Sequence, residues 1–351
     1  MRYEVSYLHD FVSNVTGGLQ KGNEHLGMLN LRLKLNPDYV SLWTGGSIYI
    51  HAAMTQGGRP ARTLTEDFHG LSNIEAGEMI YMHELWYQHR LGSTIITAGL
   101  QDLNKEFLVI ENGGRLMNST FGIPTPLAGL ATMPIFPHTT LGLTLQHKIT
   151  DEFHLQTALY DGRPDDFENN NFNLNWNLSR DDGFTSVSEL HYRSDKLTGK
   201  ETLIKGGVFY HSSNNRGSVN TPLTKTASVY ILADQQIYDD TEGPAMGVFL
   251  QAAADAGLSD ERFVYFGTGF SLRGLLRSRP DDVISFGYAG SLIGQDSRVK
   301  ESIFELSFRV YIKKEQLFIQ PDIQYIINPC GSGSKLNNAL VFLLRAGMMI
   351  H

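Results

Sequence analysis

Residues 318–333, FIQPDIQYIINPCGSG, alternate polar with apolar side chains and then enter a polar turn. This period of two is typical of a β-strand that has one wet face and one apolar face. Pro321 is tolerated because it lies near the start of the strand, where the loss of one backbone donor costs least. Gln320, Asp322 and Gln324 share the polar face, so this strand belongs to a sheet that keeps one side in water.

The same alternation recurs along the chain, for example in LGMLNLRLKL (26–35), TLGLTLQHKI (140–149) and IFELSFRVYI (303–312). No helical period lasts beyond two turns, and glycine and aromatic residues are frequent, as in chains built from many short strands. We therefore predict an all-β fold with about sixteen strands. The predicted strands cover residues 3–9, 25–35, 46–56, 78–90, 93–101, 139–149, 152–160, 184–194, 202–211, 226–237, 246–255, 262–272, 283–291, 301–312, 316–327 and 339–350.

Two sheet architectures fit this pattern. In a soluble sandwich the apolar faces of two sheets pack on each other, whereas in a membrane barrel lipid covers the apolar face and the polar face lines a lumen. An even strand number and connections that alternate between short and long favour the barrel. The predicted fold class is a transmembrane antiparallel β-barrel, with residues 1–351 forming a single outer-membrane domain.

The connection over residues 102–138 is far longer than the others and is rich in glycine, proline and small polar residues. Connections of this length in a compact domain are usually functional. In general porins the connection between the fifth and sixth strands folds into the barrel and narrows it. By that analogy, residues 102–138 are predicted to form an inserted constriction loop.

Charge and motif content exclude several function classes. The net charge of -8 and the lack of any Lys/Arg block argue against nucleic acid as a partner. Cys330 has no second cysteine with which to form an internal disulfide or a zinc site, and the twelve histidines show no ligand spacing. No HExxH, Walker or GxSxG motif is present, so we expect no enzyme, no cofactor and no metal.

The expected localisation depends on the strands. No apolar run reaches the ~20 residues that a membrane helix requires, so strands would have to cross the membrane. The longest such run, residues 339–350, is interrupted by Arg345. Residues after Met1 show no secretory leader, so we expect that a leader was removed from an outer-membrane chain.

Seven segments resemble the OprB-type carbohydrate-selective porins of bacterial outer membranes and occur in the family's order. They are SNVTGGLQKG (13–22), HGLSNIEA (69–76), HELWYQ (83–88), AGLQDLN (98–104), NSTFGIP (118–124), ALYDGRP (158–164) and IQPDIQYIINP (319–329). The chain departs from the family in ending on His351 and in the CGSG that follows the last segment. The resemblance implies a sixteen-stranded diffusion channel for monosaccharides such as glucose. It further implies an outer-membrane location among lipid and lipopolysaccharide, and assembly as a homotrimer.

A sugar-selective constriction should combine hydrogen-bonding groups with an aromatic platform, because a sugar has both hydroxyls and weakly apolar C–H faces. In MIYMHELWYQHR, strand parity sends Tyr81, Leu85 and Tyr87 to lipid and Glu84 and Trp86 inward. Trp86 is the aromatic candidate. Packing of Trp86 against the inserted loop is an equal alternative.

The inserted loop supplies Glu111, Arg115 and Asn118, and the planar donor fork of Arg115 suits sugar hydroxyls. An internal salt bridge is an equal alternative for Arg115. Resemblance alone adds Asn73 and Glu75. Parity places three further candidate cations on the inner wall, where a solvated wall is the alternative role: Arg32, Lys34 and Arg309.

Three functions remain for this sequence. The first is passive, carbohydrate-selective diffusion through a water-filled barrel. The second is a general or anion-preferring porin, because several inward cations could steer negative solutes. The third is an outer-membrane hydrolase or a closed structural barrel.

Overall fold

The structure is a computed structural model. It describes residues 1–36, 44–130, 133–164, 167–168, 170–179, 182–212, 225–240, 243–258, 262–294, 299–329 and 336–351; Cys330 lies outside these ranges. The described residues contain sixteen strands. They are β1 (Arg2–Gly18), β2 (Gly22–Leu35), β3 (Gly46–Gly57), β4 (Met79–Leu91), β5 (Thr94–Gln101), β6 (Thr140–Lys148), β7 (Phe153–Asp161), β8 (Phe184–Ser194), β9 (Thr202–Ser212), β10 (Lys225–Asp239), β11 (Ala245–Asp255), β12 (Phe263–Arg273), β13 (Val283–Ile293), β14 (Val299–Lys313), β15 (Leu317–Ile327) and β16 (Asn337–Ile350).

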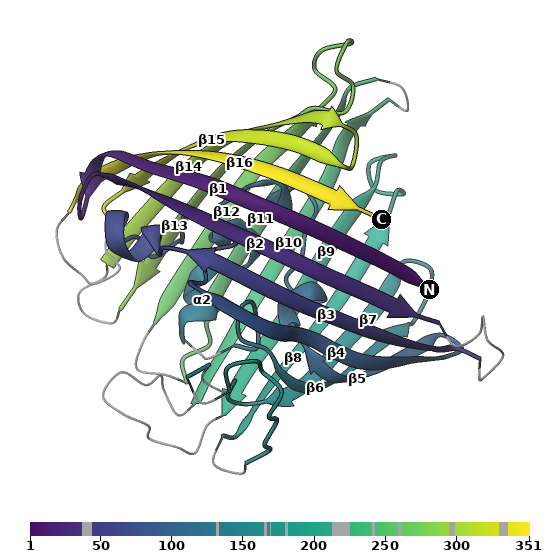
Figure 1. The fold of residues 1–351 in the computed structure, drawn as a ribbon. Coiled ribbons are helices and arrows are strands. Elements are labelled where there is room, and N and C mark those ends of the chain that lie inside the picture. Colours follow the sequence, from purple (N-terminus) through teal and green to yellow (C-terminus); the bar gives the residue numbers. More distant parts are fainter. Residues whose placement is uncertain are drawn as a thin grey trace.

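The strands form one closed barrel in which each strand pairs with its neighbours in sequence and β1 pairs with β16. All pairings are antiparallel, and in the closing pair Val5 faces Ile350. Closure leaves no unpaired sheet edge, which a strand fold in lipid requires. Figure 1 shows β1 in purple beside β16 in yellow, with both chain termini at one end of the barrel, here called the terminal end. The predicted antiparallel β-barrel of about sixteen strands is confirmed.

The longest connections, over residues 58–78, 102–139 and 162–183, all lie at the opposite end, here called the loop end. Tight turns at 92–93 and 314–316 lie at the terminal end. This asymmetry matches outer-membrane barrels, which have short periplasmic turns and longer extracellular loops. No helix among the described residues is long and apolar enough to cross a bilayer.

The alternation of residues 318–327 has the predicted physical meaning. Gln320, Asp322 and Gln324 are almost fully buried inside the barrel, whereas Ile319 is 39% and Ile323 40% exposed. The exposed residues are the lipid-facing set, because the outer face of a membrane barrel is apolar. The outer-face leucines and valines of the other strands are exposed in the same way; Leu31, Leu143 and Val208 are examples.

Two details of the strand prediction are wrong. Tyr81, predicted to face lipid, is only 2% exposed, because a register shift in the β3–β4 pairing reverses the parity of the first part of β4. β1 runs to Gly18 rather than ending at residue 9. The second half of β1 places Asp10, Val12 and Asn14 together on the inner face. Polar and apolar residues therefore do not alternate between the inner and outer faces in this part of the strand.

An apolar core occupies part of the barrel interior at the loop end. Inward side chains of the barrel wall, such as Val12, Phe249 and Val341, join one apolar core with residues of the two connections, such as Leu71 and Phe121. Burial of this apolar surface stabilises the connections inside the barrel.

Candidate pore constriction

Two connections approach the inner face of the barrel wall, and they are called here the β3–β4 loop (residues 58–78) and the β5–β6 loop (residues 102–139). The β3–β4 loop contains one short π-helix, η2 (Ala61–Thr65). The described residues of the β5–β6 loop contain four short helices, η3 (Leu103–Lys105), η4 (Gly113–Arg115), α1 (Ser119–Gly122) and α2 (Thr125–Leu130). In Figure 1, α2 is drawn within the outline of the barrel.

Carboxylates of the barrel wall hold the backbone of the β5–β6 loop. Leu108 N donates to Glu189 Oε1 of β8 at 2.7 Å. Asn112 N donates to Asp234 Oδ2 of β10 at 2.9 Å, and Asn118 N donates to a carboxylate oxygen of Glu305 in β14. Hydrogen bonds from backbone N–H groups to carboxylates are stronger than neutral ones. Three wall carboxylates therefore fix the path of the loop.

Uncharged wall groups complete this attachment. Gln251 Nε2 of β11 donates to Phe121 O at 3.0 Å, and the Tyr265 hydroxyl of β12 donates to Thr120 O at 3.0 Å. Gln324 Nε2 of β15 donates to Leu71 O of the β3–β4 loop at 2.9 Å. Each bond satisfies a buried carbonyl that would otherwise cost free energy. The inner polar face of six strands thus acts as a socket for the two loops.

A buried ion pair attaches the β3–β4 loop to the strands that close the barrel. Arg345 of β16 donates from Nε and Nη2 to the two carboxylate oxygens of Asp10 in β1, both at 2.7 Å. Ser72 donates to Asp10 Oδ2 at 2.6 Å, and Asn73 Oδ1 accepts from Arg345 at 2.9 Å. Glu75 Oε2 accepts from Ala61 N, and burial raises the pKa of Glu75 to about 8.

A cavity of about 1230 Å³, here called the vestibule, lies at the terminal end. Its lining combines residues from the short turns with Lys105, Glu106, Glu111 and Arg115 of the β5–β6 loop. Eight lysines and arginines and seven carboxylates line it, so the opposite charges nearly balance. Such a lining provides many hydrogen-bonding groups without a strong field of one sign.

Arg115 lies where the β5–β6 loop borders the vestibule. Its Nη2 donates to Glu111 Oε1 at 2.5 Å, and the Arg115 side chain is 28% exposed and that of Glu111 76% exposed. Arg115 also borders a small cavity with Arg309 and Gln320. The predicted pair of loop residues is thus brought together by an internal salt bridge, with part of both side chains open to the vestibule.

Trp86 is part of an aromatic pair on the barrel wall. Its ring stacks on Tyr49 of β3, with ring centroids 4.8 Å apart and an interplanar angle of 23°. The Lys34 ammonium lies 5.7 Å from the Trp86 ring centroid, and Trp86 Nε1 donates to Glu84 Oε1 at 3.3 Å. The carboxylate of Glu106 lies within electrostatic range of both Lys34 and Glu84. Lys34 and Glu84, the charged neighbours of the aromatic pair, therefore interact electrostatically with Glu106 of the β5–β6 loop.

Comparisons with known proteins agree with this geometry. The family model of the carbohydrate-selective porins, OprB family, matches residues 21–348. The chain belongs to the OprB family of carbohydrate-selective porins. A search of curated protein sequences finds no match.

Solved structures show the same fold. The high-pH structure of Pseudomonas putida OprB is similar at 17% identity and a TM-score of 0.87, covering 99% of this chain and 94% of that chain. The low-pH structure of the same protein matches at 14% identity and a TM-score of 0.66, with coverages of 99% and 92%. Salmonella typhi OmpF in complex with daunomycin matches at 8% identity and a TM-score of 0.61, with coverages of 99% and 97%.

Family membership and fold give the general function: this OprB-family chain is a sugar-selective porin of the bacterial outer membrane. Both indicate a channel rather than an enzyme.

The other predicted site residues of this porin have structural partners. Arg32 pairs with Glu4 of β1, and Arg309 Nε donates to Gln320 Oε1 at 2.8 Å while its guanidinium lies 4.7 Å from the Phe318 ring centroid. The Asn118 side chain accepts from Thr120 N at the start of α1 and donates to Gln324. Asn73 and Glu75 hold the β3–β4 loop, as described above, and neither lines the vestibule.

Four residues of this porin were missed by the sequence reasoning: Tyr49, Lys105, Glu106 and Gln146. Tyr49 and Gln146 could have been found by strand parity, which turns both side chains inward. Gln146 Nε2 donates to Glu106 Oε2 at 2.7 Å and so connects the wall to the loop. Lys105 is the last residue of the short helix η3 and Glu106 follows it, and the sequence does not reveal the direction of this helix.

Proposed function

We propose that this porin passes neutral monosaccharides such as glucose by passive diffusion, with the constriction formed between the β5–β6 loop and the wall near Trp86. The observation that carries the proposal is the stacked pair Tyr49–Trp86 beside charged groups from both wall and loop. A pyranose can place its C–H face on Trp86 while Lys34 and Glu106 bond its hydroxyls. Water on the vestibule side would then receive the sugar.

Arg115 and Glu111 form a second contact point in this proposal. Their salt bridge leaves donors and acceptors partly open to the vestibule. The planar guanidinium can hold two neighbouring hydroxyls of one sugar. Arg309 and the other wall residues would act by holding Gln320 and the loop, because Gln320 Nε2 donates to Arg115 O at 3.2 Å.

The nearly balanced charge of the vestibule favours a neutral solute over a general or anion-preferring porin. A planar-bilayer recording in a salt gradient separates the two functions. We expect a reversal potential close to zero, and a strong anion preference would support the alternative.

The proposal includes three further statements. The chain acts as one domain in which the β5–β6 loop is the constriction element. It carries out no hydrolysis, which an esterase assay on the purified porin can check. It assembles as a homotrimer within lipid and lipopolysaccharide, and native mass spectrometry of the detergent-extracted protein would give the number of chains.

Liposome swelling tests the sugar pathway directly. The assay compares entry of glucose, an amino acid of similar size and a larger oligosaccharide for the wild type, Trp86→Ala and Arg115→Ala. Trp176→Ala is the matched control, because Trp176 donates to Asn173 O in the β7–β8 connection and takes no part in the stacked Tyr49–Trp86 pair.

We expect glucose to enter the wild-type liposomes faster than its size predicts. Trp86→Ala and Arg115→Ala should each remove most of that advantage, because each takes away one contact with the sugar, while Trp176→Ala should keep it. Entry ordered by size alone in the wild type would show that the pore does not select sugars at this constriction.

A further inference from the structure

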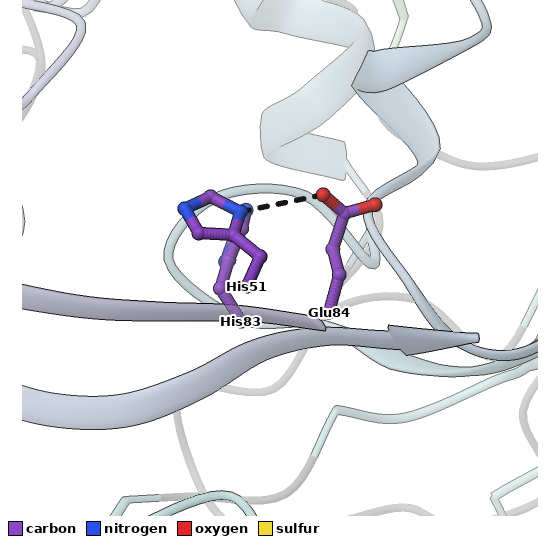
Figure 2. Close-up of side chains that lie close together, drawn as sticks. All are labelled: His51, His83 and Glu84. Carbon is purple, nitrogen blue, oxygen red and sulfur yellow. Dashed lines mark hydrogen bonds and ion pairs between the residues drawn. The ribbon is translucent and has the colours of Figure 1, made fainter. Parts of the chain in front are cut away.

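Three side chains meet inside the wall next to the constriction: His51 of β3 and His83 and Glu84 of β4. One ligand atom from each lies within 4.8 Å of the other two. The His51 and His83 rings are 4.8 Å apart at an angle of 82°. All three side chains are almost fully buried. Figure 2 shows the His51 imidazole turned toward the Glu84 carboxylate, with the His83 side chain directly behind His51.

A bulge in β4 makes this meeting possible. Neighbouring residues of a strand normally point to opposite faces. Here Glu84 pairs with His51 and Met82 pairs with Ala52, so His83 is an extra residue in β4. His83 and Glu84 therefore both point into the barrel. Bulges commonly redirect side chains at functional sites.

Hydrogen bonds on the far side of each ring fix which nitrogen is free. His51 Nε2 lies 2.9 Å from Asn30 Oδ1, and His83 Nε2 lies 3.0 Å from Asp102 Oδ2. Both oxygens only accept hydrogen bonds, so each neutral ring carries its proton on Nε2. The lone pair of each Nδ1 is then available to a ligand. A histidine whose second nitrogen is bonded to a carboxylate or an amide is the usual arrangement of a metal ligand.

The Nδ1 atoms of both histidines lack a hydrogen-bond donor among the described residues. His83 Nδ1 is buried and has no hydrogen-bond partner among the described residues. His51 Nδ1 lies 3.4 Å from Glu84 Oε2, so two acceptor atoms face each other. A cation between these atoms would satisfy all of them together, because imidazole nitrogen and carboxylate oxygen are both good ligands for transition metals.

We propose that His51, His83 and Glu84 bind one divalent transition-metal ion of the zinc type. The ligand set is two histidines and one carboxylate, which leaves a fourth position for water. Zinc–ligand distances of about 2.0–2.1 Å require ligand atoms about 3.3 Å apart, so a movement of less than about 1 Å by each side chain closes the site. The carboxylates of Glu84 and Asp102 balance the charge of the ion.

The proposed metal site would also affect the position of the β5–β6 loop, because Asp102 is the first residue of that loop. Asp102 accepts from His83 and also caps η3 by accepting from Asn104 N at 2.9 Å. A bound ion would therefore connect β3, β4 and the start of the loop. Glu84, which also accepts from Trp86, would transmit the position of the ion to the aromatic pair.

Metal content of the whole purified chain tests the site. The wild type is refolded from urea into detergent with Co²⁺ or Zn²⁺, because the buried ligands can take up an ion during folding. After dialysis, metal per chain is measured by mass spectrometry, and Co²⁺ coordination is read from its visible absorption. We expect one ion per folded chain and a tetrahedral Co²⁺ spectrum.

The variants His51→Gln and His83→Gln should each lose at least nine-tenths of the bound metal. Asp102→Asn should weaken binding by about 10–100-fold, as is usual for a group that orients a ligand. His211→Gln is the matched control, because His211 is a buried inward histidine bonded to Thr185 Oγ1, and it should keep one ion.

Electrophoretic mobility of unheated samples confirms that each variant has folded. A folded wild-type chain that binds no metal would overturn the proposal, as would equal loss of metal in His211→Gln. The wild-type result is decisive even where a variant does not fold. It is also independent of sugar transport, which liposome swelling measures separately.

Discussion

Loss of the Asp10–Arg345 pair should loosen the β3–β4 loop and lower the stability of the barrel. Asp10→Asn leaves the Arg345 guanidinium buried without its charged partner, and Arg345→Met leaves the Asp10 carboxylate in the same state. Both side chains are 4% exposed or less. Breaking a buried pair by removing one partner typically costs about 3–5 kcal/mol, whereas removing both costs much less than the sum.

The assay is equilibrium unfolding in urea of the porin refolded into lipid vesicles. With a slope of about 2 kcal/mol per molar urea, each single substitution should lower the midpoint by about 1.5–2.5 M. The urea midpoint of the double variant Asp10→Asn/Arg345→Met should be higher than the midpoint expected from adding the two single shifts. Limited proteolysis should cut single variants within residues 58–78 faster than the wild type.

The matched control is the pair Arg193–Glu201, in which both side chains are more than half exposed. Exposed pairs are worth only about 0–1 kcal/mol, so Arg193→Met and Glu201→Gln should change the midpoint little. The buried ion pair would not have the expected role if the midpoint shifts of Asp10→Asn and Arg345→Met simply added in the double variant. Midpoint shifts no larger than those of the control pair would also refute it.

Three further perturbations test other parts of the structure. A Cβ at Gly207 would lie 2.1 Å from the Tyr230 ring, whose hydroxyl donates to Glu189; Gly207→Ala should therefore cost about 1–3 kcal/mol in urea unfolding. A Cβ at Gly206 would meet nothing within 4 Å, so Gly206→Ala should leave the free energy of unfolding unchanged. Equal losses of stability in the two variants would contradict a clash with Tyr230. Burial raises the pKa of Glu75 to about 8, well above its unfolded value, so stability should fall as pH rises from about 4.3 to about 8. Glu75→Gln should flatten that dependence in urea midpoints measured across the window, and an unchanged slope would argue against a buried neutral carboxyl. Glu106→Gln removes a loop carboxylate that interacts electrostatically with Lys34 and Lys205. The reversal potential should therefore shift in the direction of anion selectivity, a change that a bilayer recording would detect or exclude.

The sequence predicts the barrel well because lipid and water impose opposite demands on alternate residues of every strand. Residues 318–327 illustrate this, since their polar and apolar sides match the buried and exposed sides of β15. Prediction fails where both sides of a strand are covered. The second half of β1 and the start of β4 pack on the two loops, so their inner residues need not be polar.

The candidate site is predicted less well for a related reason. Arg115 lies four residues after Glu111 and ends the short helix η4, so a local salt bridge between the two side chains is accessible. Tyr49 and Trp86 meet through strand pairing, which requires the register to be known. The histidine cluster depends on one extra residue in β4, and alternation alone does not reveal a bulge.

The socket for the two loops limits how pore selectivity can change. The β5–β6 loop is held by groups on β8, β10, β11, β12, β14 and β15, which are spread over more than one hundred residues of sequence. A loop grafted from another porin would find donors and acceptors in the wrong places, with several buried charges left unpaired. Exchange of loops between relatives therefore needs matching replacements in the wall, and stepwise substitution of the residues that face the vestibule is the easier route to a new solute.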